Sequence, residues 1–165
     1  MSIADKDLQR YRFLLMYDDE RVMDVAVALR EQQGQDWWKL VIDLEEGGYA
    51  ISDVSQLTVY LNEHGGDLLE QPLASLVGPV FQKTDAVLER EATTVEEARE
   101  AAFDSDAQVA VILDDEEVVG VLPVGTRSGS PFDASLVNLA GQYAELPAEG
   151  LVSKRRLARK KKKKK

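Results

Sequence analysis

One unit of the sequence occurs twice. The first copy, from Val22 to Leu57, contains an amphipathic run, an apolar run, a tight turn and a second apolar segment. The second copy, from Val95 to Arg127, has the same order of segments. Repetition of one supersecondary unit is the sequence signature of similar subunits that pack on one another and bury a shared face. The sequence therefore predicts two similar halves with a cleft between them.

The first copy predicts a helix, two strands and a second helix. Apolar side chains recur from Val22 to Leu29 at the spacing of one helical face, which is typical of an amphipathic helix. Gly47 and Gly48 stand between two apolar runs and predict a hairpin turn. The expected elements are a helix from Val22, strands at Leu40 to Leu44 and Tyr49 to Ile51, and a helix from Asp53 to about Glu63.

The second copy repeats this order. Thr94 and Glu97 have the spacing of a capping box, in which the hydroxyl accepts from one backbone amide and the carboxylate accepts from another. The continuous apolar run from Val109 to Leu113 predicts a strand that is buried on both faces. The other expected elements are short strands at Val80 to Phe81 and Ala86 to Leu88, a return strand from Val118 to Val124, and a last helix from Ala134 to Leu146.

The length of the chain limits it to one compact domain or to two small halves that share a core. It has 165 residues, of which 44% are hydrophobic, enough to fill such a core. The pattern of elements predicts the α/β class in its α+β form. We expect a first repeat at residues 1–78, a second repeat with the last helix at residues 79–146, and a tail at residues 147–165 outside the fold.

Half of the basic residues lie in the last twelve positions. The net charge is −10, and the segment from Lys154 to Lys165 holds ten of the 20 Lys and Arg residues, so the rest of the chain carries about −20. The tail is predicted either as a tether to RNA, DNA, an anionic membrane face or an import receptor, or as a disordered segment that folds back on the acidic body or aids solubility. The residues assigned to polyanion contact are Lys154, Arg155, Arg156, Arg159 and Lys160.

Several classes of chemistry have no support in the sequence. The absence of cysteine excludes disulfides, thiolate nucleophiles and thiolate metal sites. His64 is the only histidine and pairs with no Ser or Cys motif, and the sequence has no phosphate-binding loop. No apolar stretch approaches the roughly 18 residues that span a bilayer, and the N-terminus lacks the pattern of a signal peptide. We therefore expect a cytoplasmic protein that is not an enzyme and has no metal.

The order of helix, buried strand, acidic turn, glycine-bearing strand and helix resembles the CBS domain. Two copies in tandem resemble the pair called a Bateman module. The resemblance is carried by VMDVAVALREQQGQDWWKLVIDLEEGGYAISDVSQL and TTVEEAREAAFDSDAQVAVILDDEEVVGVLPV, and with the strands before them these stretches cover roughly residues 8–128. The resemblance implies two β-α-β-β-α repeats packed about a pseudo-twofold axis. It also implies adenosine-containing ligands between the repeats, with occupancy transmitted to an enzyme or channel.

Ligand contact in that family uses a Gly-x-x-(Thr/Ser)-x-x-Asp stretch at the end of the last strand. In the first copy its three positions are Tyr49, Ser52 and Ser55, so only the hydroxyl residue is kept. In the second copy the glycine is kept, while Pro123 and Thr126 replace the hydroxyl residue and the acid. Ser and Thr cannot reproduce the charge-assisted bonds of a carboxylate to two ribose hydroxyls. The candidate ligand residues are Ser52, Asp53, Ser55, Thr126 and Arg127, the last as a bidentate phosphate donor.

Two main functions of different class remain open. The first is a non-catalytic regulatory or interaction module that acts on a separate partner chain and forms a homodimer. Its dimer contact would use the apolar faces of the helices Val22 to Leu29 and Val95 to Ala102. The second is a sensor that binds AMP, ATP or S-adenosylmethionine in the cleft between the repeats. A third function, a nucleic-acid or polyanion tether, depends on the tail alone.

Overall fold

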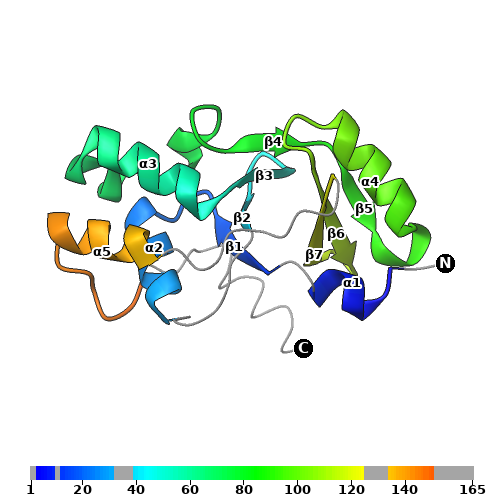
Figure 1. The fold of residues 1–165 in the computed structure, drawn as a ribbon, viewed down its shortest axis with the longest axis horizontal. Coiled ribbons are helices and arrows are strands. Elements are labelled where there is room, and N and C mark those ends of the chain that lie inside the picture. Colours follow the sequence, from blue (N-terminus) through cyan, green and yellow to red (C-terminus); the bar gives the residue numbers. More distant parts are fainter. Residues whose placement is uncertain (1–2, 10–11, 32–38, 125–133, 151–165) are drawn as a thin grey trace.

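Two small sheets lie side by side, one in each half of the molecule (Figure 1). The computed structural model describes residues 3–9, 12–31, 39–124 and 134–150. In the first sheet β1 (Phe13–Tyr17) runs parallel to β2 (Lys39–Asp43), and β2 pairs antiparallel with β3 (Tyr49–Ser52). A short strand at the edge, β4 (Gln82–Thr84), pairs antiparallel with β3. The order of the first sheet is therefore β1-β2-β3-β4.

The second sheet repeats the pairing of the first three strands. β5 (Val87–Glu89) runs parallel to β6 (Val109–Asp114), and β6 pairs antiparallel with β7 (Glu117–Pro123). In each half a helical connection joins the parallel pair and a hairpin joins the antiparallel pair, as the geometry of the two pairings requires. These shared pairings confirm the predicted duplication and the mixed α+β class.

Helices gather in the first half, at the left of Figure 1. They are α2 (Val22–Glu31), α3 (Val54–His64) and α5 (Ala134–Tyr143), and α5 packs against both of the others. The apolar face predicted for α2 is buried against the first sheet and its neighbouring helices. Because α5 comes from the end of the chain, the core of the first half includes Leu136 and Ala140.

A helix of ten residues, α4 (Val95–Asp104), covers the second sheet. It begins with the predicted capping box: the Glu97 amide donates to Thr94 Oγ1 and the Thr94 amide donates to Glu97 Oε1, each at 3.1 Å. Two orphan amides of the first turn are satisfied in this way. The buried face of α4 carries the small side chains of Ala98 and Ala102.

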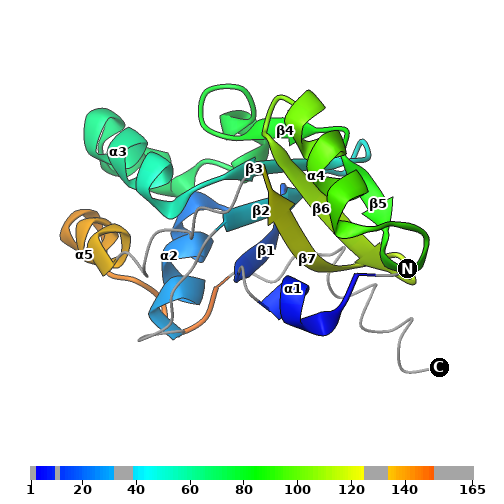
Figure 2. The same cartoon turned by 45° about the vertical axis from the view of Figure 1, so that its right-hand side comes forward.

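The short helix α1 (Asp5–Gln9) packs on the second half although it precedes the first sheet in the sequence. Leu8 lies against Gly120 of β7, so closely that a Cβ atom added at Gly120 would be 2.5 Å from Leu8 Cδ2. Ile3, just before α1, is fully buried in the second core. The two ends of the chain are therefore exchanged: α1 lies beside β7, whereas α5 packs in the first half (Figure 2).

The two hairpins differ in the residues at their turns. The β2–β3 turn uses Gly47 and Gly48, with φ angles of 108° and 85°. The β6–β7 turn uses Asp115 and Glu116, with φ angles of 54° and 69°. A residue with a Cβ atom pays a steric penalty in this left-handed region, so only the second turn carries backbone strain.

Among the described residues, short 3-10 helices lie in segments that connect the other elements. They are η1 (Gly66–Glu70), η2 (Leu73–Leu76) and η3 (Arg90–Ala92). None of the helices in the described part of the chain is long and apolar enough to cross a membrane.

Some details predicted from the sequence are wrong. Val80 and Phe81 form no strand; both are buried in the first core, and β4 begins at Gln82 instead. The last helix ends at Tyr143 rather than at Leu146.

The helix faces predicted to form a dimer contact are also assigned wrongly. The apolar side chains from Val22 to Leu29 of α2, with the partly buried Ala28 among them, pack within this chain. Ala98 and Ala102 of α4 are fully buried against the second sheet. Apolar periodicity identifies a buried face and does not tell whether the same chain or another copy buries it.

Candidate functional site

The ligand stretch predicted in the first copy lies where β3 ends and α3 begins. Ser52 is buried, and its hydroxyl donates to Gln56 Oε1 at 2.9 Å. The backbone amide of Asp53 donates to the same oxygen at 3.1 Å, and the Asp53 carboxylate forms an ion pair of 2.7 Å with Lys39 Nζ. The polar groups of Ser52 and Asp53 are therefore engaged by partners within the chain.

Ser55 is the second residue of α3 and lines a different hollow. This groove has a volume of about 390 Å³ and lies between α3 and the segment that leads into β4. Its other lining residues are Gln56, Val59, Tyr60, Glu63, Pro79, Val80 and Gln82. Thr126, Arg127 and the basic residues Lys154, Arg155, Arg156, Arg159 and Lys160 lie outside the described residues.

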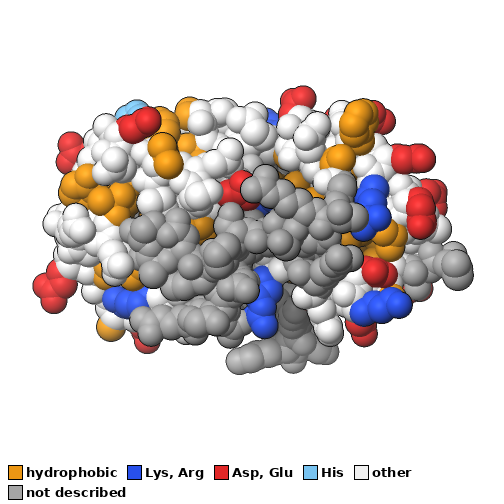
Figure 3. Space-filling model, viewed as in Figure 1, with side chains coloured by type: hydrophobic (Ala, Val, Ile, Leu, Met, Phe, Trp, Pro, Cys, Tyr) orange, Lys and Arg blue, Asp and Glu red, His pale blue; other side chains and the backbone are white. Residues whose placement is uncertain are grey.

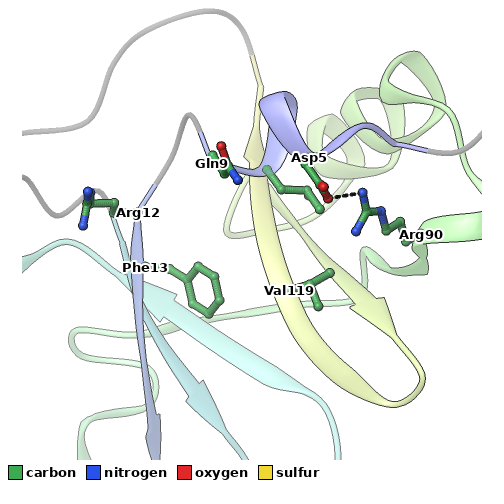
Figure 4. Close-up of a pocket in the computed structure, with 7 residues that line it drawn as sticks. Asp5, Gln9, Arg12, Phe13, Arg90 and Val119 are labelled. Atoms are coloured by element: carbon green, nitrogen blue, oxygen red, sulfur yellow. Dashed lines mark hydrogen bonds and ion pairs between the residues drawn. The ribbon is translucent and has the colours of Figure 1, made fainter.

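A larger pocket lies where α1 meets both halves, and we call it the strap pocket (Figure 4). Its volume is about 720 Å³. Its walls come from α1, the start of β1, η3 and β7. The lining residues are Asp5, Leu8, Gln9, Arg12, Phe13, Arg90 and Val119. The first and second sheets both contribute to this one pocket.

Arg90 is the cation at one end of the strap pocket. Its guanidinium pairs with the Asp5 carboxylate, donates from Nε to the Ile3 carbonyl at 2.8 Å, and lies 3.8 Å from the Asp114 carboxylate. The Arg90 side chain is only 19% exposed, whereas that of Asp5 is 73% exposed. The hydrogen bond to Asp5 raises the pKa of Arg90 above its ordinary value, so the guanidinium stays charged.

Arg12 lines the strap pocket at the start of β1, and in Figure 4 its guanidinium points away from Phe13, Val119 and Arg90. Arg12 is exposed and forms no ion pair with any other described residue. Phe13 is half-buried. A pocket in which apolar side chains lie beside the Arg90 guanidinium suits a ligand that has an apolar body and an anionic group.

A smaller pocket of about 420 Å³ is lined mainly by acidic and apolar side chains, with Lys83 as its cation, and Lys83 is paired with Glu46. His64 is exposed at the end of α3, where its ring stacks on Tyr60 at a centroid distance of 3.9 Å. Within the described ranges, no group of three or more His, Asp or Glu residues is placed to hold a metal ion. Acidic side chains are spread over the right-hand end of the face in Figure 3, where α4 lies. The strap pocket is therefore the candidate functional site.

Comparison with known proteins decides the fold. No protein-family model and no curated protein sequence matches the chain. The hexameric CBS-CP12 protein from bloom-forming cyanobacteria is similar in structure, with a TM-score of 0.50, 14% sequence identity, and coverage of 73% of this chain and 66% of that chain. The chain folds as a tandem CBS domain pair.

Other CBS pairs are similar at lower scores. The CBS-pair protein CBSX2 from Arabidopsis thaliana has a TM-score of 0.48 at 12% identity, with coverage of 84% of this chain and 93% of that chain. A cystathionine beta-synthase pair domain from Shewanella oneidensis MR-1 has a TM-score of 0.43 at 20% identity, with coverage of 69% and 61%. The match thus spans less than two thirds of the Shewanella chain and about two thirds of the cyanobacterial one.

The strap pocket of this CBS pair was missed by sequence reasoning. Asp5 and Arg90 are 85 positions apart, and neither belongs to a motif. Arg12 stands alone before a strand, as many exposed arginines do. A signal that could have pointed to the contact is Gly120 in the middle of a strand, because such a glycine often marks a close approach of another segment.

Proposed function

We propose that this CBS pair is a non-catalytic regulatory module that acts on a separate partner chain. The observation that carries the proposal is that the walls of the strap pocket come from elements of both halves. A ligand that touches α1, β1 and β7 together favours one arrangement of the halves over others, and a ligand shifts an equilibrium by its difference in affinity for the two states. The division into repeats at residues 78 and 79 is part of this proposal.

A second candidate is a sensor of an adenosine-containing ligand such as AMP, ATP or S-adenosylmethionine. The volume of about 720 Å³ and the presence of Phe13, Arg12 and Arg90 favour this candidate, since an aromatic ring and cations suit a base and a phosphate. The family resemblance places the ribose and phosphate contacts at the stretch that contains Ser52 and Asp53. There Ser52 is bonded to Gln56 and Asp53 is paired with Lys39, which argues against ligand contact at that stretch.

Thermal-shift measurements with AMP, ATP and S-adenosylmethionine test the second candidate. A ligand at 100 times its dissociation constant stabilises the folded state by about 2.7 kcal/mol, which is readily seen as a rise in Tm. Arg12→Ala should weaken the shift, and Lys6→Ala should keep it, because each change removes one positive charge and Lys6 does not line the pocket. If none of the three compounds shifts Tm, the sensor is ruled out and an interaction module without an adenosine ligand is what remains.

Action on a partner chain is tested by capture from cells that produce the protein, with quantitative mass spectrometry. A specific partner should be retained by the wild-type chain and lost when a strap-pocket ligand or the Arg90→Gln change alters the contact between the halves. Retention that is indifferent to both changes would contradict regulation through this pocket. Light scattering after size exclusion tests the homodimer. The cyanobacterial CBS-CP12 protein, which is hexameric, is a precedent for self-association of a protein with this fold.

The polyanion tether remains a separate proposal for the C-terminal tail. It is supported by ten basic residues within Lys154 to Lys165, beside a body of about −20. Binding of RNA that depends on the tail should fall steeply with salt, because each neutralised phosphate releases counterions. Deletion of residues 154–165 should remove that binding, and an unchanged affinity after deletion would rule the tether out.

A further inference from the structure

We propose that α1 is a latch on the strap pocket, and that a ligand with an oxyanion group opens it by replacing the Asp5 carboxylate on Arg90. The proposal rests on the strap pocket being the regulatory site. It adds the chemical class of the ligand, an organic phosphate or carboxylate, and the element that moves when the ligand binds.

The first step is that Arg90 holds α1 in place from inside the second half. Its guanidinium contacts the Ile3 carbonyl and the Asp5 carboxylate, and its own carbonyl accepts from the Ile3 amide at 3.3 Å. The Arg90 side chain also reaches Asp114 at the end of β6. One partly buried residue therefore joins the start of α1 to the second sheet.

The second step is that the Asp5 contact can be exchanged at small cost. The Asp5 side chain is 73% exposed, so its carboxylate returns to water when it leaves Arg90. Water competes for a well-solvated carboxylate, so an ion pair with such a partner contributes little to stability. The guanidinium is a rigid fork that also binds phosphate or carboxylate oxygens bidentately. An oxyanion that enters the strap pocket therefore competes with the Asp5 carboxylate for the Arg90 guanidinium.

The third step is that replacement of the Asp5 carboxylate on Arg90 loosens α1 and not the two sheets. The helix has only five residues, far below the length at which a helix is stable by itself. Leu8 is its buried side chain and packs against Gly120. Loss of the Asp5 contact leaves this apolar contact and the Ile3 backbone bonds to hold the helix. Occupancy of the pocket is thereby converted into a change at an exposed end of the chain.

The test compares Asp5→Asn with Asp7→Asn in the full chain. Both changes remove one negative charge from α1, and Asp7 does not line the strap pocket. The probes are inorganic pyrophosphate and succinate, titrated by calorimetry at fixed ionic strength. We expect Asp5→Asn to bind the preferred probe about three- to fivefold more tightly than wild type and Asp7→Asn, which is the range of a solvated ion pair. Preference for one probe separates a phosphate ligand from a carboxylate ligand.

Hydrogen exchange measures the latch itself. In the wild type, the preferred probe should accelerate exchange of the α1 amides that donate to the Ala4 carbonyl, those of Asp7 and Leu8. In Asp5→Asn these amides should exchange faster without any probe and respond little to it. Equal affinities for Asp5→Asn and Asp7→Asn, or α1 exchange that ignores the probe, would overturn the latch and leave the regulatory module intact.

Absence of binding by any variant would overturn the oxyanion class. The regulatory module would then depend on the thermal-shift and capture experiments, which do not require a charged ligand. The two proposals can therefore fail separately.

Discussion

The two halves of the molecule share their strand pairings and differ in how helices cover their sheets. In the first half α2, α3 and α5 bury large side chains, among them Leu57 and Leu61 at full burial. In the second half α4 presents Ala98 and Ala102, and the five-residue α1 adds Leu8. Pairing uses backbone groups that every residue has, whereas packing depends on side-chain volume. Duplication is therefore visible in the sheets, and the cores have been filled in different ways.

The largest expected effect tests whether α5 belongs to the first core. Leu136→Ala should lower the free energy of unfolding by about 2–5 kcal/mol, because it removes a fully buried side chain and leaves a cavity. Urea unfolding followed by circular dichroism measures the loss. Gln142→Ala, an exposed change on the same helix, should stay within about 0.5 kcal/mol. A loss below that level for Leu136→Ala would mean that α5 does not complete the first half.

A smaller effect is expected where α1 meets the second half. Gly120→Ala should cost about 1–3 kcal/mol in unfolding free energy, because the new Cβ atom overlaps Leu8 and forces α1 to shift. In the double variant with Leu8→Ala the two costs should be less than additive, since each change makes room for the other. Gly141→Ala of α5 has open space and should raise stability instead, as alanine favours a helix. Additive costs would show that α1 does not rest on β7.

The two hairpin turns should respond in opposite directions to exchange of their turn chemistry. Glu116→Gly should raise the free energy of unfolding by about 0.5–1 kcal/mol, since it relieves a side chain at φ 69° and gives the Asp-Gly pair that suits a tight hairpin. Gly48→Ala should lower it by about 1 kcal/mol through backbone strain alone, because nothing lies within 4 Å of the new Cβ atom. Thermal unfolding measures both. If both substitutions change the free energy of unfolding in the same direction, the contrast between the two turns is refuted.

The smallest effect concerns the ion pair that joins β4 to the β2–β3 turn. Lys83 Nζ lies 2.7 Å from Glu46 Oε1, and this hydrogen bond and charge lower the pKa of Glu46 below its ordinary value of 4.5. A depressed carboxyl pKa contributes stability above the ordinary value, and that contribution is lost as the pH falls through the folded-state pKa. In an NMR titration, Lys83→Gln should move the midpoint of Glu46 upward towards 4.5. An unmoved midpoint would show that the pair does not form in solution.

The regular elements were predictable because their signals are local. The helical spacing from Val22 to Leu29, the glycines of the first turn and the capping box of Thr94 and Glu97 each lie within a few positions. The strand at Gln82–Thr84 was misplaced because the more apolar Val80 and Phe81 precede it. Those side chains fill the first core, whereas the pairing residues of this edge strand are largely exposed.

The candidate site was much less accessible to sequence reasoning. The end of β3 follows from the local pattern, but the use of Ser52 by Gln56 and of Asp53 by Lys39 requires the tertiary structure. The strap pocket depends on the exchange of chain ends, which no periodicity encodes. A helix as short as α1 leaves a single buried Leu8 as its apolar signal.

The exchange of α1 and α5 between the halves has a consequence for folding during synthesis. Residues of α5 complete the core of the first half, so that core cannot close until nearly all of the described chain has left the ribosome. Until then α2 and α3 expose leucines that have no final partner. Contacts between such distant positions also slow folding, because a long loop must close before they form. In this CBS pair the first half, although it is synthesised first, is thus the last to complete its core.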